Sequence, residues 1–155
     1  NMKSVAYMMD TIAWNSKFKD TSKAEYVIGG PTVELFFKSY NEKYNLKNQY
    51  QAKASNATGY QISWDSGATW KNYIDTSSAY LKTDSLYVIT KQTDALAYWL
   101  TSPSAYVTTD VMNVYCDGYV GTRNYGYSIH GFRPLVCLKS DVTLEKVSDT
   151  EYAIQ

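Results

Sequence analysis

The last third of the chain alternates between segments that favour strands and one that does not. Residues 98–100 and 132–138 are rich in aromatic and branched side chains, which favour strands. Between them runs a passage rich in Tyr, Gly and Asn with almost no hydrophobic pattern. This layout predicts a rigid scaffold that presents a long loop, an arrangement common in binding domains.

The first part of the chain carries helical patterns. Apolar residues at helical spacing predict a helix over 5–14. A second helix is expected after Pro31, because proline suits a first helical turn and one face of the segment is apolar: Val33, Phe36, Phe37, Tyr40 and Tyr44.

Strands are expected from there to the end of the chain. The predicted strands cover 86–89, 98–100, 111–115 and 132–138, with a short strand at 25–28, a hairpin over 59–70 and a closing hairpin from 142–144 and 152–154. The strand at 132–138 is expected to be central. Together these elements predict an α+β domain with two helices packed on a small twisted antiparallel sheet with long loops.

Length and charge limit the kind of protein. A chain of 155 residues is expected to form a single domain, 1–155. The net charge is zero and no basic patch is visible, so neither nucleic acid nor an anionic membrane is an expected partner. No apolar run approaches the roughly 18 residues of a membrane span, so membrane insertion is not expected. Asn1 before Met2 suggests a fragment of a longer protein.

The chain shows no complete catalytic set, so we expect no enzyme activity. His130 is the sole histidine, and no nucleophile motif is present. Asp110, Asp117 and Asp141 do not form an EF-hand pattern, so no metal and no cofactor are expected. Cys116 and Cys137 lack a Cys-x-x-Cys spacing. Two buried free thiols are favoured over a disulfide, which remains open.

Residues 63–70 match the Asp-box pattern Ser-x-Asp-x-Gly-x-Thr-Trp at every fixed position. The pattern resembles the hairpin repeated in sialidase propellers, but it occurs once here. It therefore predicts a structural hairpin, with Asp65 tying the turn and Trp70 packing inward, rather than a glycan-processing site.

Tyrosine is the unusual residue type, with 16 Tyr against 4 Phe. Tyrosine supplies rigid amphipathic contact area at recognition surfaces, although it also fills strands and cores. Arginine adds a charged fork, and Asn and Asp add adaptable polar contacts. The predicted ligand contacts lie mostly in the Tyr-rich passage: Tyr106, Asn113, Tyr115, Asp117, Tyr119, Arg123, Asn124, Tyr125, Tyr127 and His130.

Three segments, 24–32, 98–103 and 131–140, resemble a domain of unknown function found in bacterial surface and prophage proteins. The Trp-Leu-x-Ser-Pro and Phe-Arg-Pro elements within them carry the resemblance. That domain is similar to the C-type-lectin-like fold of formylglycine-generating enzymes and of proteins diversified by retroelements. The resemblance implies a C-type-lectin-like fold and a non-catalytic recognition or display module. Such a module would be extracellular, on a cell surface or phage particle, and would bind a protein or glycan ligand.

The resemblance also bears on variation and on two alternative functions. Residues 113–138 contain no Lys, Glu, Gln, Met or Trp, the five types that retroelement mutagenesis of Asn codons cannot produce. This agreement implies a diversified surface over 113–130. The first alternative function is a carbohydrate-binding domain that uses Trp64, Trp70 and tyrosines. The less favoured one is a formylglycine-generating type of oxidase, which needs Cys116 and Cys137 close together.

Overall fold

The computed structural model describes Ile12 and residues 24–55, 59–75, 78–90, 95–127, 129–148 and 151–154. Within these residues the protein is mostly β, with one described helix, α3, and ten strands in four separate sheets. The predicted C-type-lectin-like arrangement of two helices packed on one small sheet is therefore wrong. The helix predicted over 5–14 lies outside the described residues, apart from Ile12.

Helix α3 (Val33–Tyr44) forms where the sequence predicts it. The Thr32 side chain caps its start by accepting a hydrogen bond from the Leu35 N–H, and Asn45 ends it in a left-handed conformation. The expected apolar face is confirmed, because Val33, Phe36, Phe37 and Tyr40 are all buried.

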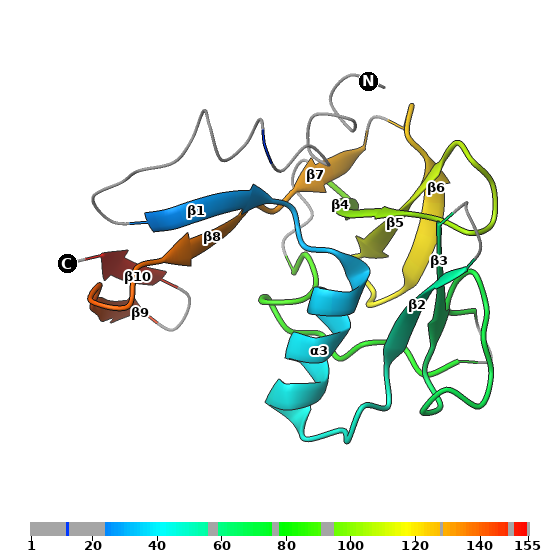
Figure 1. Ribbon diagram of the computed structural model, residues 1–155, viewed down its shortest axis with the longest axis horizontal. Coiled ribbons are helices and arrows are strands. Elements are labelled where there is room, and N and C mark those ends of the chain that lie inside the picture. Colours follow the sequence, from blue (N-terminus) through cyan, green and yellow to red (C-terminus); the bar gives the residue numbers. More distant parts are fainter. Residues whose placement is uncertain are drawn as a thin grey trace.

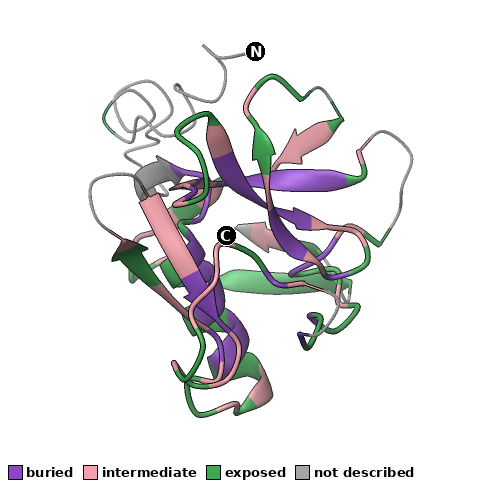
Figure 2. Cartoon of the chain, turned by 90° about the vertical axis from the view of Figure 1, so that its right-hand side faces the viewer, coloured by how far each residue is buried: buried purple, intermediate pink, exposed green. Residues whose placement is uncertain are grey.

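The core lies between α3 and a four-stranded sheet of order β6-β5-β4-β7. Its strands are β4 (Ala97–Pro103), β5 (Asp110–Tyr115), β6 (Val120–Asn124) and β7 (His130–Phe132), and β7 runs parallel to β4. Buried residues, purple in Figure 2, lie along α3 and these strands. The strands predicted at 98–100 and 111–115 are confirmed.

The segment between 100 and 132 is expected to be a long surface loop, but much of it forms strands β5 and β6. Val114 and Val120 are fully buried, and β5 pairs with β6 in regular register. The sequence pattern did not show β6, because Val120 is its single large apolar residue beside Gly, Thr, Arg and Asn.

Ser102 in β4 ties the sheet to the start of α3. Its hydroxyl accepts a hydrogen bond from the Val33 N–H at 2.9 Å, and the Thr101 N–H donates to the Pro31 carbonyl at 2.9 Å. Gly30 permits this close approach, because a Cβ there would lie 2.9 Å from Thr101 Cγ2.

A second hairpin consists of β2 (Gln51–Ser55) and β3 (Gly59–Ser63). Strand β2 lies in a polar segment over which the sequence predicts no strand. The Asp-box turn after β3 forms as predicted: Asp65 Oδ1 accepts hydrogen bonds from Thr69 N and Ser63 Oγ, both at 2.8 Å. These bonds lower the pKa of the Asp65 carboxyl to about 2.

Strands β1 (Ala24–Gly29) and β8 (Leu135–Leu138) form a two-stranded arm that extends away from the body (Figure 1). The hairpin of β9 (Leu144–Ser148) and β10 (Glu151–Ile154) lies beyond the arm (Figure 1). A closing hairpin forms as predicted, but its first strand is 144–148 rather than 142–144.

Three strand predictions are wrong. In the hairpin predicted over 59–70, only 59–63 is a strand, and the chain returns to it through a single bridge between Ile62 and Lys71. The segment 132–138 is not one central strand, since Pro134, which cannot donate a hydrogen bond to a ladder, separates β7 from β8. In β8, Val136 is 50% exposed. The predicted strand at 86–89 is instead a turn, because the Asp84 carboxylate accepts a hydrogen bond from the Leu86 N–H.

Candidate ligand-binding face

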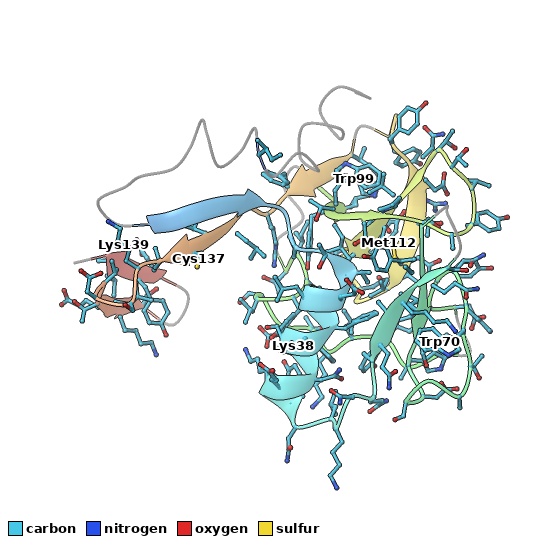
Figure 3. All side chains as sticks on the ribbon, viewed as in Figure 1. Lys38, Trp70, Trp99, Met112, Cys137 and Lys139 are labelled. Atoms are coloured by element: carbon cyan, nitrogen blue, oxygen red, sulfur yellow. The ribbon has the colours of Figure 1, made fainter. Side chains whose placement is uncertain are left out.

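The four-stranded sheet carries different layers on its two faces. Met112 points into the main core with α3, whereas Trp99 belongs to a second cluster with Val111 (Figure 3). Tyr125 and Phe132 pack against this second cluster. Side chains alternate along strands, so the face away from α3 is built from the other half of each strand.

The strand register brings the second layer together. Trp99 in β4 lies opposite Asn113 in β5, and Asn113 lies opposite Gly121 in β6. Val111 lies opposite Arg123. Asn113 and Arg123 therefore project from the same face of the sheet.

His130 lies at the centre of this layer. Its ring stacks on Trp99 at 4.1 Å between centroids, and the rings of Tyr115 and Tyr127 meet it edge-on at 5.7 Å each. Asn113 is fully buried, and its Nδ2 lies 2.6 Å from His130 Nε2. The imidazole is thus held by three rings and an amide.

The surroundings of His130 favour its neutral form. Burial, and then the positive charge of Arg123, lower the pKa of His130 to about 4. With the Asn113 amide donating to Nε2, the remaining proton lies on Nδ1. Neither His130 Nδ1 nor Asn113 Oδ1 has a hydrogen-bond partner among the described residues, although both are buried. Leaving such a buried group without a hydrogen bond costs roughly 1–3 kcal/mol of folding free energy. Native structures contain few of these groups, and a functional role is one explanation for them.

Arg123 lies at the exposed rim of the layer. Its Nε donates to the Tyr115 hydroxyl at 2.6 Å, and its guanidinium carbon lies 5.8 Å from the ring centroids of both Tyr115 and Tyr127. Its terminal nitrogens make no hydrogen bond or ion pair within the described part of the chain. We call this layer the Arg123 face. It consists of Trp99, Asn113, Tyr115, Arg123, Tyr127 and His130, of which Trp99 and Asn113 are buried.

Most of the predicted contacts come together at or beside this face. Tyr119 contacts the Tyr115 ring at 5.4 Å, and its own ring lies so close to Gly121 that a side chain there would collide with it. Tyr125 packs against the Trp99 cluster. Seven of the ten predicted contact residues lie together here: Asn113, Tyr115, Tyr119, Arg123, Tyr125, Tyr127 and His130.

Three predicted contacts have other surroundings. Tyr106 is 59% exposed, but its ring contacts Tyr73 at 6.4 Å. The side chains of Asp117 and Asn124 accept hydrogen bonds from the N–H groups two residues on, at Tyr119 and Gly126, so they shape turns.

Sequence reasoning missed Trp99. The signal was present, since Tyr98, Trp99 and Leu100 place large apolar side chains at successive strand positions, which indicates that both faces of that strand are covered.

Arg133 bounds a second feature, a largely apolar pocket of about 540 Å³ between α3, the turn at 85–87 and the start of the arm. Its terminal nitrogens donate to the carbonyls of Ser85, Leu86 and Val88 at 2.8–3.0 Å, and its guanidinium lies 4.4 Å from the Tyr98 ring. Arg133 thus holds the turn in place and offers little to a ligand.

The tryptophans of the Asp-box region are covered by lysines. Lys53 Nζ lies 4.0 Å from the Trp70 ring centroid, and Lys71 Nζ lies 5.2 Å from that of Trp64. Cation–π contacts of this kind occupy a ring face that a sugar would need. Trp70 is half-buried rather than packed in the core.

Neither cysteine forms a disulfide within the described residues, and the two lie in different parts of the fold. Cys137 lies in the arm (Figure 3), and Cys116 follows β5 in the body. Within the described residues, no group of three His, Cys, Asp or Glu side chains could hold a metal ion.

Comparison with known proteins gives a family. Residues 17–140 match DUF6273, described as a domain of unknown function, so the chain belongs to the DUF6273 family. The resemblance to a domain of unknown function is confirmed at that level. Neither the curated proteins nor the solved structures gave a match. In the described part of the chain, no helix is long and apolar enough to span a membrane.

Proposed function

We propose that this chain is a non-catalytic recognition module that binds a protein ligand through the Arg123 face. The observation that carries the proposal is the aromatic layer around His130. The His130 ring packs on Trp99 and contacts Tyr115 and Tyr127, and these two tyrosines in turn contact Arg123. Tyr127 is 49% exposed, so its ring is open to a partner.

The residue types of the face favour a protein ligand over a glycan. Tyr, Trp and Arg dominate binding energy in protein interfaces, and Tyr offers contact area at a small cost in conformational entropy. Preorganised side chains lose less entropy on binding. The proposal includes an extracellular location in a bacterial surface or phage-particle protein, which the sequence resemblance supports.

The test is selection from a phage-displayed random peptide library on the immobilised chain. Recovered peptides should bind Tyr127→Ala at least tenfold more weakly than the wild type. Tyr152→Ala is the matched control, because Tyr152 lies in the β9–β10 hairpin and is similarly exposed at 55%. Its affinity should stay within about twofold of the wild type, in keeping with neutral contacts outside a hot spot.

Two results would contradict the proposal. One is a set of peptides that bind Tyr127→Ala as tightly as the wild type. The other is a glycan array on which neutral sugars bind the chain and lose binding in Tyr127→Ala, while the peptide library yields nothing.

A further inference from the structure

We propose that the Arg123 face recognises a carboxylate, supplied by an Asp or Glu side chain of the protein ligand. This inference rests on the proposed function and names the chemistry at its centre. Three observations carry it: the orientation of the Arg123 guanidinium, its unused donors, and the absence of an acidic partner among the described residues.

The guanidinium is held in one orientation before any ligand arrives. Its Nε is bonded to the Tyr115 hydroxyl, and the tyrosine rings of residues 115 and 127 lie at equal distance from its carbon atom, 5.8 Å. An exposed arginine normally loses rotamer freedom when it binds. Here part of that loss has already occurred in the free protein.

Within the described residues nothing bonds the two terminal nitrogens of Arg123, which leaves them for a ligand. Guanidinium donors are arranged as a planar fork that matches the two oxygens of a carboxylate. Arg133 shows what happens when the fold uses the same fork itself, because its terminal nitrogens are bonded to backbone carbonyls. Arg123 makes no such bonds to the described residues.

The local charge calls for a single negative charge. The ion pairs Lys43–Asp84 and Lys71–Asp75 involve neither Arg123 nor its neighbours, and Arg123 forms no ion pair with a described residue. His130 is held neutral, so it adds no second positive charge. A phosphate group carries about −1.5 to −2 at neutral pH and is better matched by several cations, whereas a carboxylate carries one charge. One cation between two tyrosines therefore suits a carboxylate.

The side chains around Arg123 favour a carboxylate that belongs to a protein rather than to a sugar. The side chains around Arg123 are rings and small polar groups of the kind that surround charged hot spots in protein interfaces. An acidic sugar could present the same group, and the experiment separates the two sources.

The experiment repeats the peptide selection in parallel on the wild type, Arg123→Gln and Lys38→Gln. Lys38→Gln is the charge control, since it removes one exposed positive charge from α3. Wild-type selections should be enriched in peptides with an Asp or Glu at a fixed position. These peptides should bind Arg123→Gln at least tenfold more weakly and Lys38→Gln within twofold. When the Asp or Glu of such a peptide is replaced by Asn or Gln, its affinity for the wild type should also fall at least tenfold.

A second arm presents the chain to an array of sialic-acid, glucuronate and neutral glycans. Binding of acidic sugars alone, lost in Arg123→Gln, would overturn the protein source. Peptides that depend on Tyr127 but bind Arg123→Gln unchanged would overturn the carboxylate and leave the proposed function standing. Peptides that depend on neither residue would overturn both.

Discussion

Arg123 in β6 and Arg133, one residue beyond β7, both lie against tyrosine rings, but the fold uses their donors differently. Arg133 bonds three backbone carbonyls of the turn after Asp84. Among the described residues, Arg123 bonds only through Nε, to a tyrosine hydroxyl that is itself part of the face. The comparison teaches that an arginine is a candidate for ligand binding when the fold fixes its orientation but does not bond its terminal nitrogens.

The largest expected difference between the two arginines is in folding stability. Arg133→Gln removes charge-assisted hydrogen bonds and a cation–π contact, so we expect a loss of about 2–4 kcal/mol in the free energy of unfolding. Arg123→Gln should change it by less than about 0.5 kcal/mol, as is usual for an exposed substitution. Urea unfolding of both variants measures the difference. Equal losses would show that Arg123 is structural as well.

The next effect concerns the acid stability that depends on the layer beneath Arg123. The pKa of His130 is lowered to about 4 in the folded protein, below the ordinary value of 6.5. Between these values the unfolded chain binds more protons, so stability falls as pH drops from about 6.5 to about 4. Because His130 is only half-buried, we expect a loss of about 1–2 kcal/mol rather than the full shift.

His130→Gln is the variant that isolates this effect. Its stability should change less than that of the wild type between pH 6.5 and pH 4. Below pH 4 both proteins should lose further stability, because Asp65 and Asp84 have pKa values of about 2 and must be protonated. Urea midpoints across this range provide the measurement. Parallel profiles for the two proteins would contradict the assignment.

The elements that could be predicted from the sequence are those with a single buried apolar face or with local hydrogen bonds. Helix α3 was predicted because Pro31 and its apolar stripe leave no alternative, and the Asp-box turn because Asp65 bonds locally. The prediction of one strand over 132–138 was wrong, because the segment is hydrophobic but Pro134 cannot donate a hydrogen bond to a strand ladder. The arm could not have been foreseen, since its exposed position depends on the pairing of β8 with β1, a long-range contact.

The candidate site was predicted in part, for a related reason. Tyrosine and arginine content indicated recognition, and most of the chosen residues do gather around His130. What the sequence could not supply was the register that places Asn113 inside and Arg123 at the rim. Nor could it distinguish Arg123 from Arg133, because the carbonyls that engage Arg133 lie more than forty positions away in the chain.

A smaller effect tests how Arg123 is oriented. Tyr115→Phe keeps the ring and removes the hydroxyl that holds Arg123 Nε. The guanidinium regains freedom, so we expect peptides selected on the wild type to bind about three- to tenfold more weakly, up to about 1.4 kcal/mol. Tyr106→Phe is the control, because its ring lies against Tyr73. Unchanged affinity in Tyr115→Phe would mean that the hydroxyl does not position Arg123.

The smallest effect reports directly on the distance between charge and imidazole. Arg123 lowers the pKa of His130 through its positive charge, after burial, which is the larger cause. Arg123→Gln should therefore raise the pKa of His130 by a few tenths of a unit, about the size expected for one partly screened charge. Arg133→Gln, at a pH where it remains folded, should leave that pKa unchanged. His130 is the sole histidine, so its ring protons can be followed by NMR without ambiguity. An equal shift in both variants would indicate a general change in the sheet, whereas a shift in Arg123→Gln alone would place its charge beside the imidazole.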